Sequence, residues 1–123
     1  NGLLALAQAL KELDEQGGWK SRRMRYRTLA SRVADTCKKL GVTEWLPAQE
    51  SSCVLRSYHL PAGMTYNQLH DGLKQQGFVI YAGQGDLATR LFRISTMGEI
   101  SDYDMARLEQ ALILVIEGAR NQK

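Results

Sequence analysis

The sequence predicts an α/β domain, a two-layer α/β sandwich in which helices cover one face of a small, mainly antiparallel sheet. The 123 residues suit one domain, and 44% hydrophobic with 24% charged residues is an ordinary globular composition. Helix and strand patterns follow one another in the order helix, helix, strand, helix, strand, strand, helix. Three or four short strands with helices on one face leave the other sheet face needing a partner.

Two helices are expected at the start of the chain. Apolar residues recur at three- and four-residue spacing over residues 3–13, and Gly17 and Gly18 follow. Glycine adopts the left-handed conformation that ends a helix, so this pair marks a break. A second run with helical spacing covers residues 26–40 and ends at Gly41.

The middle of the chain alternates between strand and helix. Residues 53–60 contain β-branched and aromatic side chains without helical spacing, which predicts a strand. Thr65 and Gln68 have the spacing of a capping box, so a short helix begins there and ends at Gly77. The compact apolar run 78–81 predicts the next strand.

The last third is expected to contain a loop, a strand and a helix. Residues 83–86 are expected to form a loop, and residues 91–96 form the next strand. Ser101 and Asp104 have capping spacing, and apolar residues then recur at helical spacing over 105–119. The chain therefore ends in a long helix.

Several classes of protein are excluded by simple counts. The longest apolar run, 111–116, is far shorter than the roughly 20 residues that span a bilayer. Cys37 and Cys53 are too few for a disulfide scaffold and lack metal-site spacing, so we expect no metal site and a reduced, cytoplasmic setting. Asn1 stands where an initiator methionine would, and Leu3 already belongs to a helical pattern. We therefore expect a piece of a longer protein.

Positive charge is concentrated in residues 20–32, which hold six of the 16 Lys and Arg and no Asp or Glu. Arg22, Arg25 and Arg32 lie off the apolar stripe of their helix. A solvated helix face explains such a cluster, but it could also meet nucleic acid, an anionic small molecule or an acidic partner.

Arg93 is the strongest candidate for a functional residue. Side chains alternate along a strand, so Phe92 and Ile94 share one face and Arg93 points to the other. A guanidinium in mid-strand is costly to desolvate unless an anion meets it, and its planar fork suits a carboxylate or phosphonate. An ordinary salt bridge or an exposed strand edge remains the alternative explanation.

The segment 78–83, a polar loop, and then Phe92-Arg-Ile-Ser-Thr-Met-Gly-Glu-Ile100 with a capped helix resemble the C-terminal end of class V aminotransferases. The chain is most similar to the branch of 2-aminoethylphosphonate–pyruvate transaminases. Upstream, Gly17-Gly18 and Arg25-Tyr26-Arg27 are also similar to that group. The resemblance covers essentially the whole chain.

This resemblance implies a homodimeric enzyme dependent on pyridoxal phosphate, whose small C-terminal domain closes on a larger cofactor domain. Residues 1–18 would end a helix leading from that larger domain, and residues 19–123 would form the small domain. The parent enzyme would transfer an amino group from 2-aminoethylphosphonate, or a similar donor, to pyruvate. Arg93 matches the family's arginine that binds the acidic group of the substrate.

The resemblance also implies what this chain lacks. No lysine has a context resembling the family's Schiff-base lysine, so we expect no catalytic or cofactor-binding residue here, no bound pyridoxal phosphate and no activity for the chain alone. The lysines compared are Lys11, Lys20, Lys38, Lys39, Lys74 and Lys123. We expect no membrane or nucleic-acid partner. A non-catalytic module that uses helix 20–32 on nucleic acid is the alternative.

Overall fold

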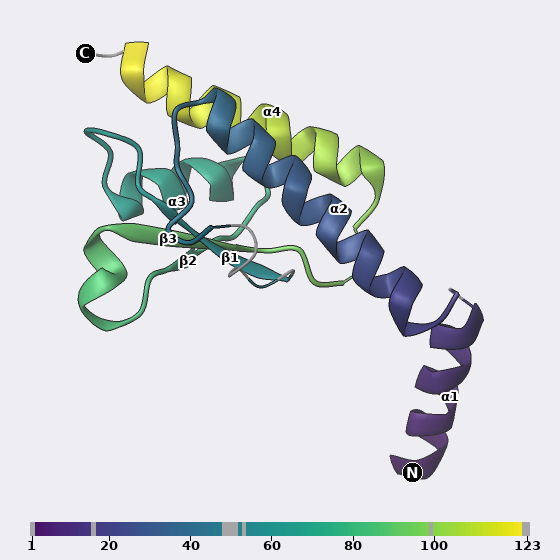
Figure 1. The fold of residues 1–123 in the computed structure, drawn as a ribbon. Helices are drawn as coiled ribbons and strands as arrows, with labels where there is room; N and C mark the ends of the chain where they lie inside the picture. The colour runs from purple at the N-terminus through teal and green to yellow at the C-terminus, as the bar shows by residue number, and fades with distance from the viewer. Residues whose placement is uncertain (1, 16, 48–51, 53, 99, 122–123) are drawn as a thin grey trace.

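Three helices lie on one side of a three-stranded sheet, and a fourth extends away from this body (Figure 1). The computed structural model describes residues 2–15, 17–47, 52, 54–98 and 100–121. The elements in chain order are α1 (Gly2–Glu15), α2 (Gly18–Lys39), β1 (Leu55–His59), α3 (Tyr66–Gln75), β2 (Tyr81–Ala82), the 3-10 helix η2 (Gly85–Thr89), β3 (Leu91–Ser95) and α4 (Asp102–Asn121).

The sheet has the strand order β1-β3-β2, and both pairings are antiparallel. The central strand β3 therefore has a hydrogen-bonded neighbour on each side. The predicted two-layer α/β sandwich with an antiparallel sheet is confirmed. Among the described residues, no helix combines the length and apolarity that crossing a membrane requires.

The hydrophobic core lies between β3 and the helices above it. Phe92 is fully buried and its ring stacks on that of Tyr58, with centroids 5.4 Å apart. Leu29 of α2 and Leu112 of α4 are fully buried in the same cluster. Cys37 is also in this core, and burial raises the pKa of its thiol to about 12. At neutral pH this thiol stays protonated, which excludes a thiolate nucleophile here.

The two predicted capping motifs are present. Gln68 N donates to Thr65 Oγ1 at 3.2 Å, and Thr65 N donates to Gln68 Oε1 at 2.9 Å, so a capping box starts α3. Asp104 N donates to Ser101 Oγ at 3.0 Å, and Ser101 N donates to Asp104 Oδ2 at 3.2 Å. Each pair satisfies backbone donors that have no partner within the helix.

Several boundaries differ from the prediction. The second strand begins at Tyr81, not at position 78, because β2 pairs with β3 only through Tyr81 and Ala82. The first strand, expected from residue 53, begins at Leu55 in the structure, and Cys53 lies outside the described residues. Part of the expected loop is the 3-10 helix η2. α2 starts at Gly18, well before the apolar spacing begins at position 26, because the polar residues between them continue the same helix.

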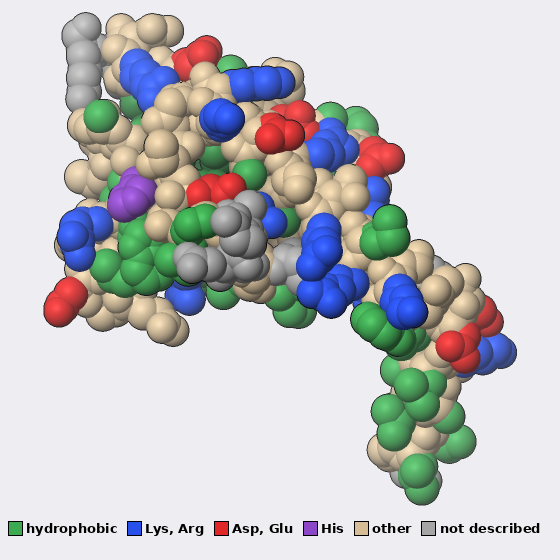
Figure 2. Space-filling view, in the orientation of Figure 1, with side chains coloured by type: hydrophobic (Ala, Val, Ile, Leu, Met, Phe, Trp, Pro, Cys, Tyr) green, Lys and Arg blue, Asp and Glu red, His purple; other side chains and the backbone are tan. Residues whose placement is uncertain are grey.

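The helix α1 has the expected spacing of leucines but buries none of them. Leu3 is 77% exposed and Leu10 is 53% exposed. The break after it is at Gly17 and Gly18, both with positive φ (93° and 84°). Figure 2 shows the hydrophobic side chains gathered along α1 where it extends from the body.

Candidate anion-binding site

Arg93 lies at the centre of the sheet face that the helices leave open. The antiparallel register places it opposite Ser57 of β1 on one side and Tyr81 of β2 on the other. Residues directly opposite in an antiparallel pair point to the same face, so these three side chains form one row across the sheet. The neighbours Phe92 and Ile94 are buried on the helix-covered face, whereas Arg93 is half-buried. The predicted alternation of burial therefore holds for residues 92–94, whereas Leu91, on the same side of the strand as Arg93, is also buried.

One hydrogen bond fixes the direction of the Arg93 side chain. Its Nε donates to the backbone carbonyl of Ala82 on β2 at 2.7 Å. No carboxylate among the described residues forms an ion pair with this guanidinium. With Nε engaged by a neutral carbonyl, the two terminal NH₂ groups remain geometrically suited to an anion that approaches end-on.

Tyr66, at the start of α3, binds the backbone segment that leads into β2, a contact that the sequence did not indicate. Its hydroxyl donates to the carbonyl of Ile80 at 3.1 Å. Burial raises the pKa of Tyr66, and the positive charge of Arg93 opposes that rise. This contact joins residues 14 positions apart through a loop, so no short sequence pattern announces it.

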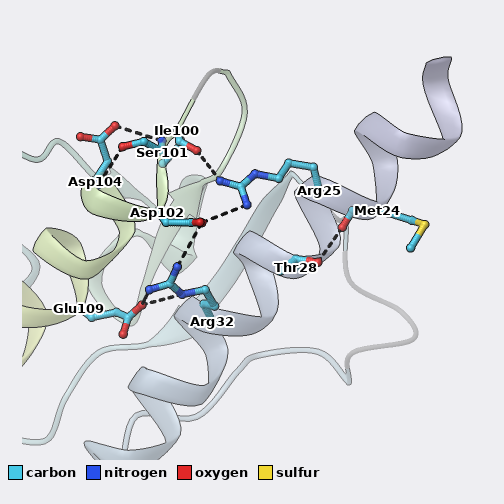
Figure 3. A network of polar contacts seen from close by, with 9 residues as sticks. All are labelled: Met24, Arg25, Thr28, Arg32, Ile100, Ser101, Asp102, Asp104 and Glu109. Atoms are coloured by element: carbon cyan, nitrogen blue, oxygen red, sulfur yellow. Dashed lines mark hydrogen bonds and ion pairs between the residues drawn. The ribbon is translucent and has the colours of Figure 1, made fainter. Parts of the chain in front are cut away.

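The basic helix α2 uses two of its arginines within the fold (Figure 3). Arg32 Nε donates to Glu109 Oε1 at 2.8 Å, and Arg32 Nη1 lies 3.6 Å from Asp102 Oδ1. Arg25 Nη1 lies 3.1 Å from the same Asp102 oxygen, and Arg25 Nη2 donates to the Ile100 carbonyl at 2.8 Å. Both arginines bind α4 or the loop before it, although the Arg25 side chain stays exposed, as a solvated helix face predicts, and Arg32 is half-buried.

None of the described lysines has the buried or cation-flanked surroundings expected of a lysine that binds an aldehyde cofactor as a Schiff base. A lysine that forms a Schiff base is activated by desolvation or by a neighbouring cation. All five described lysines are exposed on helices, and Lys123 lies outside the described residues; the five are Lys11, Lys20, Lys38, Lys39 and Lys74. Among the described residues there is also no group of three metal-ligating side chains.

No family model matches the sequence. The chain is similar to a 2-aminoethylphosphonate–pyruvate transaminase from Aeromonas hydrophila, at 40% identity over 101 residues, or 80% of this chain and 26% of that protein. The protein of the same name from Syntrophobacter fumaroxidans is 39% identical over 109 residues, or 87% of this chain and 29% of that protein. The chain thus spans less than a third of the length of these relatives.

A solved structure has the same fold. The alanine–glyoxylate aminotransferase from Nostoc sp. superposes with a TM-score of 0.81 over 91% of this chain and 30% of that one, at 19% identity. The relatives confirm the resemblance to 2-aminoethylphosphonate–pyruvate transaminases. The superposition confirms that the fold is one found within aminotransferases, as an α/β unit that makes up a minor part of the larger chain.

Proposed function

We propose that this chain is the small-domain part of an aminotransferase that moves an amino group from 2-aminoethylphosphonate to pyruvate. The 40% identity to a relative of that name, over 80% of the chain, is the observation that carries the proposal. Aminotransferases of this kind depend on pyridoxal phosphate. The residues that hold the cofactor would belong to the rest of the enzyme, as the resemblance implies.

Within that enzyme, Arg93 binds the acidic group of the substrate. Three features support this role: its place at the centre of the open sheet face, the tie from Nε to Ala82, and no ion pair to a carboxylate among the described residues. An end-on guanidinium offers two parallel N–H donors, which match two oxygens of a phosphonate or carboxylate. This contact orients the substrate, and the reaction itself belongs to the cofactor.

Residues 1–18 connect this domain to the larger one, and residues 19–123 form the small domain. The leucines of α1 are exposed on a helix that leaves the body, and an apolar helix face of this kind is stable when another part of the protein covers it. The complete enzyme is a homodimer, as the resemblance implies, and works in the reduced, cytoplasmic setting that the cysteine count favours.

The test uses the complete enzyme and two donors that differ in the acidic group. With pyruvate as acceptor, 2-aminoethylphosphonate should yield alanine, and β-alanine, its carboxylate analogue, should yield alanine more slowly. Equal rates with both donors would contradict the phosphonate assignment but keep the aminotransferase. No alanine from any amino donor would contradict the function altogether.

A second test uses the 123-residue chain alone. With pyridoxal phosphate it should form no Schiff base that borohydride reduction traps on one lysine.

A further inference from the structure

The segment that holds Arg93 is itself held by Tyr66. Tyr66 is the first residue of α3, directly after the Thr65 cap, so the capping box fixes where its ring leaves the helix. Its hydroxyl donates to the carbonyl of Ile80 at 3.1 Å. Ile80 is the residue before β2, and the carbonyl of Ala82 in β2 accepts a hydrogen bond from Arg93 Nε at 2.7 Å. Two hydrogen bonds thus connect α3 to Arg93 through three residues of backbone.

The strand β2 is very short, so a contact from outside the sheet can add to its support. It pairs with β3 through two residues only, and it lies at the edge of the sheet. A two-residue edge strand has little cooperative support from its own ladder. The Tyr66 hydroxyl supplies a contact from outside the sheet, on the carbonyl just before the paired residues. Releasing it would let the Ala82 carbonyl move and would free the Arg93 side chain to rotate.

We propose that Tyr66 is a positioning residue for Arg93: its hydroxyl holds residues 80–82 so that the Ala82 carbonyl aims the guanidinium end-on at the substrate's anionic group. This proposal rests on the proposed function of Arg93 and deepens it. The proposal gives Tyr66 a role through Arg93 and no contact of its own with the substrate.

The experiment is a double-mutant cycle in the complete enzyme. Tyr66→Phe keeps the ring, which packs on His70 with centroids 5.6 Å apart, and removes only the hydroxyl. Loss of one neutral hydrogen bond predicts a rise of roughly 3- to 10-fold in KM for the anionic donor, with kcat nearly unchanged. Tyr103→Phe is the matched control, because Tyr103 is 73% exposed on α4; it should change neither constant.

The second side of the cycle repeats Tyr66→Phe in an Arg93→Lys enzyme. Lysine keeps the charge but has no Nε–H for the Ala82 carbonyl, so the KM effect of Tyr66→Phe should disappear there. An equal KM effect in both backgrounds would make Tyr66 a general structural residue and overturn the proposal. No KM effect in the Arg93 enzyme would overturn it as well. Failure of the proposed function gives a different result: Arg93→Lys alone would then leave KM unchanged.

Discussion

The two faces of the sheet differ in burial and polarity along the same strand. On the helix-covered face, Phe92 is 0% exposed and Ile94 is 6% exposed. On the open face, the side chain between them is a half-buried arginine in a row with Ser57 and Tyr81. Neighbouring positions of β3 therefore have different physical roles, and substitutions one residue apart should have effects of different kinds.

The largest effect is expected on the covered face. Phe92→Ala removes a fully buried ring that stacks on Tyr58, and large-to-small changes of this kind cost about 3–5 kcal/mol of unfolding free energy. Urea denaturation of the complete protein, followed by tryptophan fluorescence, measures it. Ser57→Ala on the open face is the control and should change stability by less than about 0.5 kcal/mol. Equal losses for both variants would break the distinction between the faces.

On the open face, Arg93→Ala should affect activity and not folding. Loss of the guanidinium group is expected to lower kcat/KM by at least roughly 100-fold. Arg93→Lys should have an intermediate effect, because lysine keeps the positive charge but cannot form the two parallel hydrogen bonds of a guanidinium. Steady-state kinetics and melting temperatures of the complete enzyme are compared. Near-normal kcat/KM, or loss of activity only through unfolding, would show that Arg93 is structural.

A smaller effect is expected where α2 meets α4. Arg32→Ala removes the contacts with Glu109 and Asp102, and because the Arg32 side chain is 33% exposed, solvent screening limits the loss to about 1 kcal/mol. Arg23→Ala, an exposed position on the same helix, should cost nothing measurable. Thermal unfolding at two salt concentrations checks both variants. The Arg32 effect should shrink as salt rises, and an effect independent of salt would point to packing instead.

The smallest effect concerns the cap of α4. Hydrogen bonds from the Ser101 backbone and side chain lower the pKa of Asp104. A carboxylate with a lowered folded-state pKa stabilises the fold above its ordinary pKa, and that contribution is lost as pH falls through the folded value. Melting temperatures between pH 2 and 5 should therefore fall less steeply for Asp104→Asn than for the parent. Parallel curves would mean that the cap does not couple to folding.

Local chemistry made much of this architecture predictable from sequence. Alternation placed Arg93 on the open face, and the capping pairs at Thr65 and Ser101 marked where two helices begin. These signals act within one or two turns of chain. The start of the edge strand was wrong by three residues, because its position depends on which residues pair with β3 across the turn.

Long-range contacts explain what the sequence did not reveal. Arg32 meets Glu109 from 77 positions away, and nothing near Arg32 distinguishes it from the exposed Arg23. Tyr66 is equally ordinary in sequence, and only the folded chain brings its hydroxyl to the segment that holds Arg93. Which side chains belong to a site is decided by topology once elements far apart in sequence come together.

The exposed helix α1 has a consequence for how the chain opens and closes locally. It buries no residue, and the two positive-φ glycines after it separate its backbone hydrogen bonds from those of α2. A 14-residue helix without tertiary support is marginal in water, so α1 should unfold without disturbing the core. Its amide hydrogens would exchange with deuterium far faster than those of α2 around Leu29 and Val33. Slow exchange in α1 would then report directly that another surface has covered its leucines.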